Sequence, residues 1–470
     1  MKPSKSLTIL MALAAMLAVP ATAAARKPNV ILIFVDDMGY NDLSCYGSEK
    51  IKTPNLDRLA SEGKRFTSFM VPSSVCSPSR AALLTGCYPK RVDMEKHVLF
   101  PQSRKGINPD EYTLADHFSS AGYATTAIGK WHLGHYPETL PRVLGFGSYY
   151  GIPYSNDMNH PDNKGKASPA SDESWENQSE SVKLWHTPLV ENETIIELPA
   201  DQRTITRRYT ERAIGFIDAN KEKPFFIYLP HSMPHIPLFV PEDVLDPDPA
   251  NAYTCTIEHI DAEIGRIMAK VREEGLDKET IIIFTSDNGP WIRFKNHGGN
   301  ADPLREGKGT PFEGGQRVPC IMWAPGRIPA GTVSDELVTS MDLLPTLAAM
   351  TDIPLPENGK PIDGINLSPT ITGQSPSARH EFIYYTANGE LIGLRKDGWK
   401  LLLNPAGKKR EPMLFNITKD MGEKKDLSAT NKEIVGEMTT RMLELDKEIE
   451  SNRRPAWTTR EDHPWPDEIR

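Results

Sequence analysis

The stretch Asn29-Val-Ile-Leu-Ile-Phe-Val35, followed directly by Asp36 and Asp37, indicates the class of fold. A continuous apolar and β-branched run of this length is typical of a strand that is buried on both faces. Such strands lie in the middle of parallel sheets, and α/β sheets bind their ligands at the carboxyl ends of these strands. The two carboxylates therefore mark a candidate site at the end of a central strand.

Two more segments repeat this pattern later in the chain. Thr280-Ile-Ile-Ile-Phe-Thr285 leads into Ser286-Asp287-Asn288-Gly289, and Pro224-Phe-Phe-Ile-Tyr-Leu229 leads into Pro230-His231-Ser-Met-Pro-His235. Because the carboxyl ends of neighbouring parallel strands meet at one edge of a sheet, we expect these polar residues to lie in a single site.

Helix-like stretches separate the strands, with apolar residues at helical spacing in Thr53–Glu62 and Tyr253–Glu274. This alternation predicts an α/β fold whose large mixed, mostly parallel sheet is sandwiched by helices. The stretch from about 151 to 198 is different, because it is rich in Ser, Asn, Asp and Pro and carries Trp175 and Trp185. It predicts a long insertion at the surface.

The pattern changes again near residue 375. Short strand candidates separated by Asn-Gly and Asp-Gly turns, and then a helix over about 432–450, predict a small C-terminal antiparallel sheet plus one helix. We therefore expect a catalytic α/β domain over 26–375 and an α+β subdomain over 376–470. The tail after Asn452 is predicted to be irregular.

The first 25 residues predict an export signal. Lys2 and Lys5 precede the apolar run Leu7–Val19, and Ala21-Thr22-Ala23 supplies small residues for cleavage. A retained membrane anchor is the alternative, but the run is short for a membrane span. Residues 1–25 are therefore interpreted as a signal peptide, and the mature protein as periplasmic or secreted, with no stable membrane insertion.

The net charge and the number of cysteines both bear on which classes of function are compatible with the sequence. The formal net charge is -9, from 54 basic and 63 acidic residues, which argues against general binding of nucleic acid. An odd number of cysteines in an exported protein indicates one thiol with a separate task. The five are Cys45, Cys76, Cys87, Cys255 and Cys320. If Cys76 is the thiol with the separate task, the other four could form up to two disulfides or remain buried thiols.

Asp36, Asp37, Asp287 and Asn288 together predict a metal site. Four oxygen-bearing side chains suit a hard divalent cation, whereas zinc prefers nitrogen and sulfur ligands. A pair such as Asp-Asp alone would more often cap a turn or a helix. The position of both pairs directly after buried strands favours the metal.

Cys76 lies in a segment that favours an anion. The residues Cys76-Ser77-Pro78-Ser79-Arg80 predict a helix from about Ser79, whose positive end would point at Cys76. Arg80 adds a planar cationic donor. An unmodified thiol here is expected to have a low pKa; the alternative is a structural cysteine beside a capped helix.

The segment from Cys76 to Arg80, with Leu83-Leu84-Thr85-Gly86 beyond it, resembles the signature of type I sulfatases in the alkaline-phosphatase-like superfamily. Further segments agree in order along the chain, among them Gly129-Lys130-Trp131-His132-Leu133-Gly134 and Gly307-Lys308-Gly309. The stretch Gly151-Ile-Pro-Tyr-Ser155 is similar to the arylsulfatase A branch. The resemblance covers nearly the whole mature chain.

This resemblance implies a chemistry and a set of residue roles. It implies that a maturation enzyme oxidises Cys76 to Cα-formylglycine, whose hydrated form attacks sulfur, and that one Ca²⁺, with Cys76 beside it, is bound by the four oxygen-bearing side chains. His235 with Lys308 would protonate the leaving oxygen, and His132 would then help to deprotonate the second hydroxyl of the hydrated residue, which expels sulfate and regenerates the aldehyde. The catalytic residues implied are Cys76, Arg80, Lys130, His132, His235 and Lys308.

Three other functions remain as alternatives. A phosphoric ester hydrolase with two metals would need more ligands than the sequence offers. A calcium-stabilised binding protein would have no need of Cys76, Arg80 and the histidines, and a redox protein would need a cysteine close to Cys76. The predicted location and the insertion favour a sulfated carbohydrate as the substrate, with a sulfated small molecule as the alternative.

Overall fold

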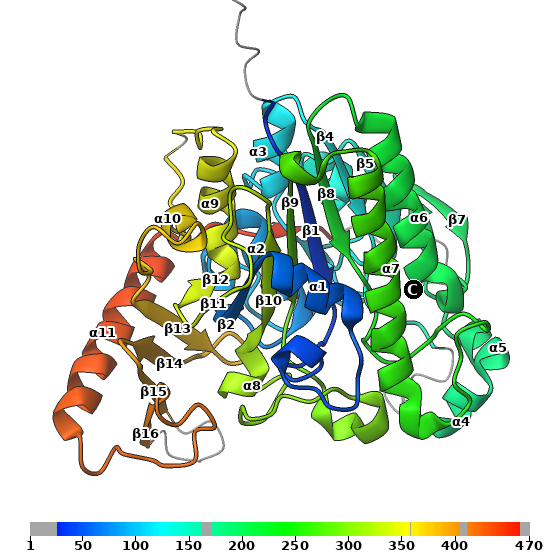
Figure 1. Cartoon of the computed structure of the whole chain (residues 1–470). Coiled ribbons are helices and arrows are strands. Elements are labelled where there is room, and N and C mark those ends of the chain that lie inside the picture. Colours follow the sequence, from blue (N-terminus) through cyan, green and yellow to red (C-terminus); the bar gives the residue numbers. More distant parts are fainter. Residues whose placement is uncertain (1–25, 161–170, 358, 404–410, 461–470) are drawn as a thin grey trace, which may run out of the picture.

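The computed structural model describes residues 26–160, 171–357, 359–403 and 411–460. The quoted stretch forms strand β1 (Asn29–Val35), which lies in the middle of the large sheet (Figure 1). Its two neighbours are β8 (Phe225–Pro230) and β9 (Thr280–Ser286), and both run parallel to it. The three strands predicted from the sequence are therefore adjacent. The proposed signal peptide lies outside the described residues.

The large sheet contains 11 strands in the order β11-β2-β10-β9-β1-β8-β4-β5-β6-β7, with β12 paired to β2. Pairs around β1, β4 and β8 are parallel, whereas β10 and the β5-β6-β7 edge are antiparallel. The prediction of a mixed, mostly parallel sheet is confirmed. The remaining strands are β2 (Lys64–Met70), β4 (Ala124–Ile128), β5 (Ser148–Gly151), β6 (Leu189–Glu191), β7 (Thr194–Glu197), β10 (Arg317–Trp323), β11 (Thr332–Ser334) and β12 (Val338–Thr339).

Side chains of β1 alternate between two separate cores. Val30, Leu32 and Phe34 belong to one hydrophobic cluster, and Ile31 and Ile33 belong to the other. Alternate residues of a strand point to opposite faces, so both faces of the sheet are covered. This double burial explains why the strand reads as an uninterrupted apolar run.

Helices from distant parts of the chain cover the two faces. One core contains residues of α1, α6 and α7, and the other contains residues of α2, α3 and α9. Figure 1 shows α7 lying along the sheet beside α6. The helices are α1 (Pro54–Glu62), α2 (Cys76–Thr85), α3 (Leu114–Ser120), α4 (Asp172–Glu176), α5 (Gln178–Ser181), α6 (Gln202–Asn220), α7 (Ala252–Glu273), α8 (Glu313–Gln316), α9 (Leu343–Met350), α10 (Ser368–Ile371) and α11 (Lys432–Ser451).

A second sheet forms near the C-terminus, as predicted. Its antiparallel strands pair in the order β13-β14-β15-β16, and α11 packs against them. Their core also takes in Met70, Ala82 and Met341 from the main body of the molecule. The strands are β13 (Glu381–Tyr385), β14 (Leu391–Lys396), β15 (Trp399–Leu403) and β16 (Pro412–Asn416).

Two regions differ from the sequence expectation. The stretch 151–198 is not a simple surface insertion, because β6 and β7 extend the large sheet and Trp175 and Trp185 are buried. The tail after Asn452 is not wholly irregular, since β17 (Trp457–Thr458) pairs with β3 (Lys105–Gly106). β3 and β17 are two residues long and distant in the sequence, and β6 and β7 form a short hairpin, so local sequence carries little signal for these strands.

All five cysteines are free thiols, which is the second of the two outcomes left open by the sequence. Cys45 is half-buried and the other four are buried. Within the described ranges, none of the helices has the length and apolar character needed to cross a membrane.

Candidate active site

The carboxyl ends of β1 and β9 bring the predicted metal-binding residues together. Val35 pairs with Ser286, so the residues that follow each strand are neighbours. The backbone N–H of Asp37 donates to Asp287 Oδ1 over 3.2 Å, and Asn288 Nδ2 donates to Asp37 Oδ1 over 2.6 Å. Asp37 adopts a left-handed backbone with φ of 65°, a conformation that is concentrated at functional sites.

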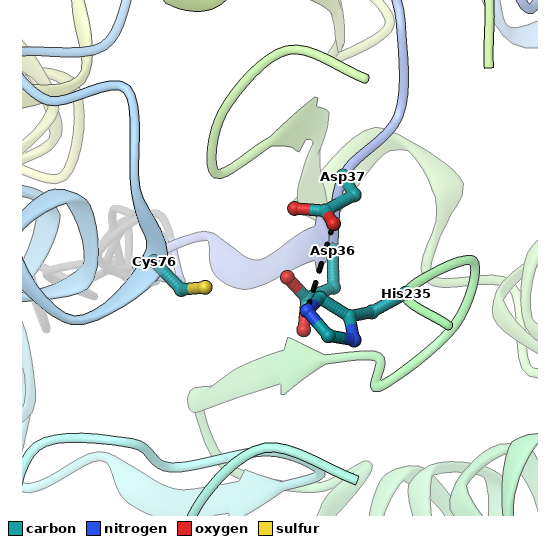
Figure 2. A group of neighbouring side chains, drawn as sticks. All are labelled: Asp36, Asp37, Cys76 and His235. Atoms are coloured by element: carbon teal, nitrogen blue, oxygen red, sulfur yellow. Dashed lines mark ion pairs between the residues drawn. The ribbon is translucent and has the colours of Figure 1, made fainter. Parts of the chain in front are cut away.

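Helix α2 begins at Cys76, about three residues earlier than the sequence predicted. Val75 has an extended backbone and precedes the first turn, so Cys76 to Pro78 are helical themselves. Cys76 therefore lies in the first turn, where free N–H groups and the helix dipole favour negative charge. Figure 2 shows its sulfur directed toward the carboxylates of the site.

The thiol of Cys76 does not have the low pKa expected from the sequence. Burial raises its pKa to about 12, and the nearby cations Lys130 and Lys308 only partly oppose this effect. The carboxylates of Asp36 and Asp287 raise the pKa further. Because the thiolate is the reactive form of cysteine, the unmodified side chain is a poor nucleophile at neutral pH.

Arg80 and Lys130 form a fully buried ion network with two of these carboxylates. Arg80 donates through Nη2 and Nε to Asp287 Oδ2, over 2.7 and 3.1 Å, and through Nη1 to the Lys130 carbonyl over 2.8 Å. Lys130 Nζ contacts Asp36 and donates to Ser155 Oγ over 3.0 Å. The Arg80, Lys130, Asp36 and Asp287 side chains are 0% exposed. Buried charges require such partners, so these positions are tightly fixed.

Lys308 reaches the same site from a glycine-rich loop. Its Nζ lies 2.7 and 2.8 Å from the two carboxylate oxygens of Asp37. The loop is anchored next to Cys76, because Gly309 N–H donates to the Ser74 carbonyl over 2.9 Å. A Cβ on Gly289 would lie 1.7 Å from the Gly314 carbonyl oxygen, so only glycine permits this approach of loop and strand end.

The two predicted histidines are buried and neutral. Burial, and then Lys308, lower the pKa of His235, while burial, and then Lys130, lower the pKa of His132. His235 Nδ1 donates to the Ile236 carbonyl over 2.6 Å, so its Nε2 carries a lone pair and lies 3.6 Å from Asp37. His132 Nε2 donates to the Leu99 carbonyl over 2.9 Å. The Nδ1 lone pair of His132 is enclosed and has no hydrogen-bond partner.

The donor set at the strand ends fits a divalent cation. Asp36 Oδ1 and Asn288 Oδ1 are buried without hydrogen-bond partners, although buried polar atoms are normally paired. Possible ligand atoms of Asp36, Asp37, Cys76 and His235 lie within 4.8 Å of one another (Figure 2). Two of these four atoms are carboxylate oxygens, and the side chains of Asp287 and Asn288 beside them add further oxygens, which suits a hard cation such as Ca²⁺.

The protein's own cations compensate the three buried carboxylates unequally, because Lys130 lowers the pKa of Asp36 against the effect of burial, whereas the pKa values of Asp37 and Asp287 stay raised. Burial, and then Asp36, raise the pKa of Asp287 to about 7. Burial also raises the pKa of Asp37, despite the adjacent Lys308. A bound divalent cation reverses this effect, since it is the largest local charge in such a site.

Three further residues lie at the site that sequence reasoning did not assign to it. Ser155 accepts the hydrogen bond from Lys130, and Asp157 is close enough to Lys130 and Lys308 for both to lower its pKa, although burial raises it overall. Trp291 lies against Lys308 and His235. Trp291 follows Asn288 by three residues, and that proximity is the one signal that could have identified it.

In this site, Cys76 at the N-terminus of α2 faces buried carboxylates and cations. Together, this fold and this site define a hydrolase of the alkaline-phosphatase-like superfamily. The sulfatase family model matches residues 28–353. A model described as the C-terminal region of N-sulphoglucosamine sulphohydrolase matches residues 308–448. The chain belongs to the sulfatase family and is a sulfatase.

Individual relatives agree with this assignment. Human arylsulfatase A is 41% identical over 382 residues, covering 80% of this chain and 73% of the relative. Dog N-acetylgalactosamine-6-sulfatase is 36% identical over 374 residues, covering 77% and 70%. The crystal structure of Ps i-CgsB in complex with k-i-k-neocarrahexaose is similar with a TM-score of 0.77, at 30% identity, covering 92% of this chain and 95% of that one.

Proposed function

We propose that this sulfatase removes sulfate from sulfated carbohydrates, using residue 76 as Cα-formylglycine and one bound Ca²⁺. The observation that carries this proposal is the position of Cys76 in the first turn of α2, facing carboxylates and the cations Arg80, Lys130 and Lys308. A sulfate ester is a compact anion, and such an enclosure of fixed donors suits it.

The Ca²⁺ would be held by Asp36, Asp37, Asp287 and Asn288, with residue 76 beside it. The unpartnered Oδ1 atoms of Asp36 and Asn288 support this assignment. When bound, the ion would polarise a sulfuryl oxygen and increase the positive character of sulfur. Asn288 would then present its oxygen toward the ion, since amide orientation follows the surrounding partners.

Formylglycine supplies a hydrated aldehyde oxygen as the nucleophile, in place of a thiol that is protonated at neutral pH. Arg80 and Lys130 orient this residue and bind the sulfuryl oxygens. Their network of buried ion pairs fixes them before substrate arrives, so little reorganisation accompanies the reaction. A serine at position 76 would become trapped as a stable sulfate ester, which explains the need for the modified residue.

Proton transfers are assigned to three neighbouring side chains. The Nδ1 of His132 has a free lone pair, which supports a role in accepting a proton from the nucleophile side. Lys308 is held protonated because Asp37 raises its pKa against the effect of burial. We assign Lys308 with His235 to the leaving oxygen, where Lys308 is the charged proton donor and the neutral ring of His235, with a lone pair on Nε2, lies beside it.

The charges of the site support an anionic substrate. Three carboxylates, Asp36, Asp37 and Asp287, face three cations, Arg80, Lys130 and Lys308. A divalent cation added to this balanced set leaves an excess of positive charge. A sulfate monoester carries one negative charge and so reduces this excess without an extra protein cation.

The carbohydrate assignment rests on relatives. The name of N-acetylgalactosamine-6-sulfatase and the neocarrahexaose complex of Ps i-CgsB both indicate sulfated sugars for those proteins. We extend this substrate class to the present chain, together with export to the periplasm or exterior and conversion of Cys76 by a maturation enzyme. Residues 26–375 are proposed as the catalytic domain and 376–470 as the C-terminal subdomain.

The experiment is a sulfate-release assay on 4-nitrophenyl sulfate and on sulfated oligosaccharides, with 4-nitrophenyl phosphate as the competing substrate. Chelation should abolish sulfate release, and added Ca²⁺ should restore it. Asn288→Leu should require more Ca²⁺ for the same activity, whereas substitution of exposed Asn296 by Leu should not change the requirement. Activity that survives complete metal removal, or faster hydrolysis of the phosphate ester, would contradict the proposal.

A further inference from the structure

The active site communicates with solvent on the side of Lys308. Asp36, Arg80 and Lys130 have side chains that are 0% exposed, and His235 is 3% exposed. The Lys308 side chain is 7% exposed, and the nearby residues Glu306 and Gly309 are exposed. The rest of a large substrate must extend through the side that solvent can reach.

Trp291 lies beside this opening. Lys308 Nζ is 4.4 Å from the centroid of its ring, and the ring of His235 is 5.6 Å away. Trp291 is half-buried, so part of its surface is open to solvent. The segment that carries Trp291 is joined to the loop that carries Lys308, because the Lys308 N–H donates to the Pro290 carbonyl over 2.9 Å. The indole is therefore fixed next to the two residues proposed to serve the leaving group.

Arg293 extends this surface outward. Its guanidinium carbon lies 4.4 Å from the Trp291 ring centroid and 4.8 Å from that of Phe294, whose ring meets Trp291 edge-on at 4.8 Å. Arg293 is exposed, and among the described residues it makes no ion pair with a carboxylate. An arginine that rests on two aromatic rings is ordered by them and keeps its donor fork free for an anion.

We infer that Trp291 and Arg293 form a leaving-group subsite for an anionic glycan. The part of the Trp291 side chain that is open to solvent contacts the sugar that loses its sulfate, beside the ring surface that Lys308 and Arg293 occupy. Arg293 binds a second sulfate or a carboxylate on the same or the adjacent sugar. This inference rests on the proposed function and adds that the preferred substrates carry more than one anionic group.

The test compares sulfate release from small and large substrates. The small probe is 4-nitrophenyl sulfate, and the large probes are oligosaccharides derived from heparan sulfate, chondroitin sulfate and carrageenan. Arg293→Gln should lower kcat/KM for the oligosaccharides about tenfold more than for 4-nitrophenyl sulfate, mainly through KM. Lys295→Gln removes the same charge from an exposed position in the same loop and should leave both values unchanged.

Trp291→Phe provides the second variant, because phenylalanine keeps an aromatic ring under Lys308 and loses part of the indole face. It should lower the oligosaccharide-to-aryl ratio of kcat/KM about threefold. Equal losses on both kinds of substrate would mean that Trp291 only holds Lys308, and would overturn the inference. If the wild-type protein hydrolyses 4-nitrophenyl sulfate but none of the oligosaccharides, the subsite inference is overturned and the proposed sulfate hydrolysis stands. If the wild-type protein is inactive on every substrate, both proposals are overturned.

Discussion

Lys130 shows how a single residue links structure to chemistry in this site. Its ammonium is completely buried between Asp36 and Ser155, and its carbonyl accepts a hydrogen bond from Arg80. Removing one partner of a buried ion pair leaves the other charge uncompensated, at a cost of about 3–5 kcal/mol. We therefore expect position 130 to serve both stability and the proposed catalysis.

Lys130→Met should lower kcat/KM for sulfate release at least about 100-fold, since one fixed donor to the sulfuryl oxygens is lost. Steady-state kinetics on 4-nitrophenyl sulfate measures this, and circular dichroism reports whether the variant is folded. Lys278→Met changes an exposed lysine in the same way and should keep full activity. A folded Lys130→Met protein with wild-type kinetics would remove Lys130 from the proposed site.

His132 predicts the shape of the pH profile. Burial, and then Lys130, hold its pKa well below the usual value of 6.5, so the ring stays neutral as the pH falls through 6.5. Activity should therefore persist on the acid side until the pH is clearly below 6.5. His132→Gln should reduce kcat by a factor of about 10²–10⁴ and change the pH dependence of kcat on the acid side, which is the acid limb of the profile. A wild-type limb at or above pH 6.5 that is unaltered in the variant would exclude His132 as the proton acceptor.

The strand ends indicated the four proposed metal ligands, and the resemblance to sulfatases supplied the six proposed catalytic residues. The fold brings these ten residues together, and their roles stay predictions. Sequence could not predict the left-handed backbones of Asp37 and His132, because tertiary contacts impose them. It also missed Ser155 and Trp291, since serine and tryptophan carry no distinctive spacing. The low thiol pKa expected for Cys76 was wrong because the sequence does not reveal complete burial.

At the scale of elements, the C-terminal sheet is joined to the loop that carries Lys308. Glu313, at the start of α8, accepts hydrogen bonds from Lys400 Nζ on β15 over 3.0 Å and from the Tyr384 hydroxyl on β13 over 2.7 Å. Lys400 also pairs with Glu423 over 2.9 Å, and Glu423 accepts from the Glu313 N–H over 2.7 Å. The three charged side chains form a buried bridge between the two sheets.

This bridge should make stability depend on acid pH. Burial alone would raise the pKa of Glu313, but Lys400, Arg395 and Arg317 lower it to about 2, below the ordinary value of 4.5. A lowered carboxyl pKa stabilises the fold above pH 4.5, and this contribution is lost as the pH falls from 4.5 toward 2. Because burial raises the pKa of Glu423, which acts in the opposite sense, we expect a net loss of about 1–3 kcal/mol.

Urea unfolding of wild type and Glu313→Gln between pH 6 and pH 3 measures this loss. The glutamine variant should be less stable at pH 6 and should lose less stability on acidification, because it has no charge to neutralise at position 313. Glu433→Gln changes an exposed glutamate and should follow the wild-type curve. Parallel curves for wild type and Glu313→Gln would show that the bridge does not govern acid stability.

The central elements were predictable and the edge elements were not. β1, β8 and β9 are long apolar runs because they are buried on both faces, and their limits match the sequence expectation within a residue. β7 has an exposed and half-buried pattern at the sheet edge, and β17 contains two residues. β7 pairs with its neighbour in the sequence, β6, and β17 pairs with the distant β3, and both are too short or too exposed for local composition to identify them.

At the scale of the whole molecule, the two sheets share one continuous interior. The core of the C-terminal sheet includes Met70, Ala82 and Met341, and Arg395 on β14 donates to Ser68 on β2 over 2.7 Å. Arg379 also pairs with the buried Asp342. We therefore expect the predicted domains 26–375 and 376–470 to unfold together.

Calorimetry should show one cooperative unfolding transition for the mature chain, because neither sheet keeps a complete core alone. A chain ending at residue 375 should be insoluble or unfolded, since it exposes the apolar surface that the C-terminal strands cover. Shortening the chain only by residues 461–470 is the control and should preserve the single transition. Two separate transitions, or a folded and active truncated protein, would show that the C-terminal unit is independent.

The central claim is that residue 76, as formylglycine, carries out sulfate ester hydrolysis. The most direct measurement is peptide mass spectrometry across residue 76, made on the same protein that is assayed for sulfate release, with Cys76→Ser in parallel. The account predicts an aldehyde or its hydrate at position 76 in active protein and no multiple turnover by Cys76→Ser. Fully active protein with an unmodified thiol at position 76, or normal turnover by Cys76→Ser, would contradict it.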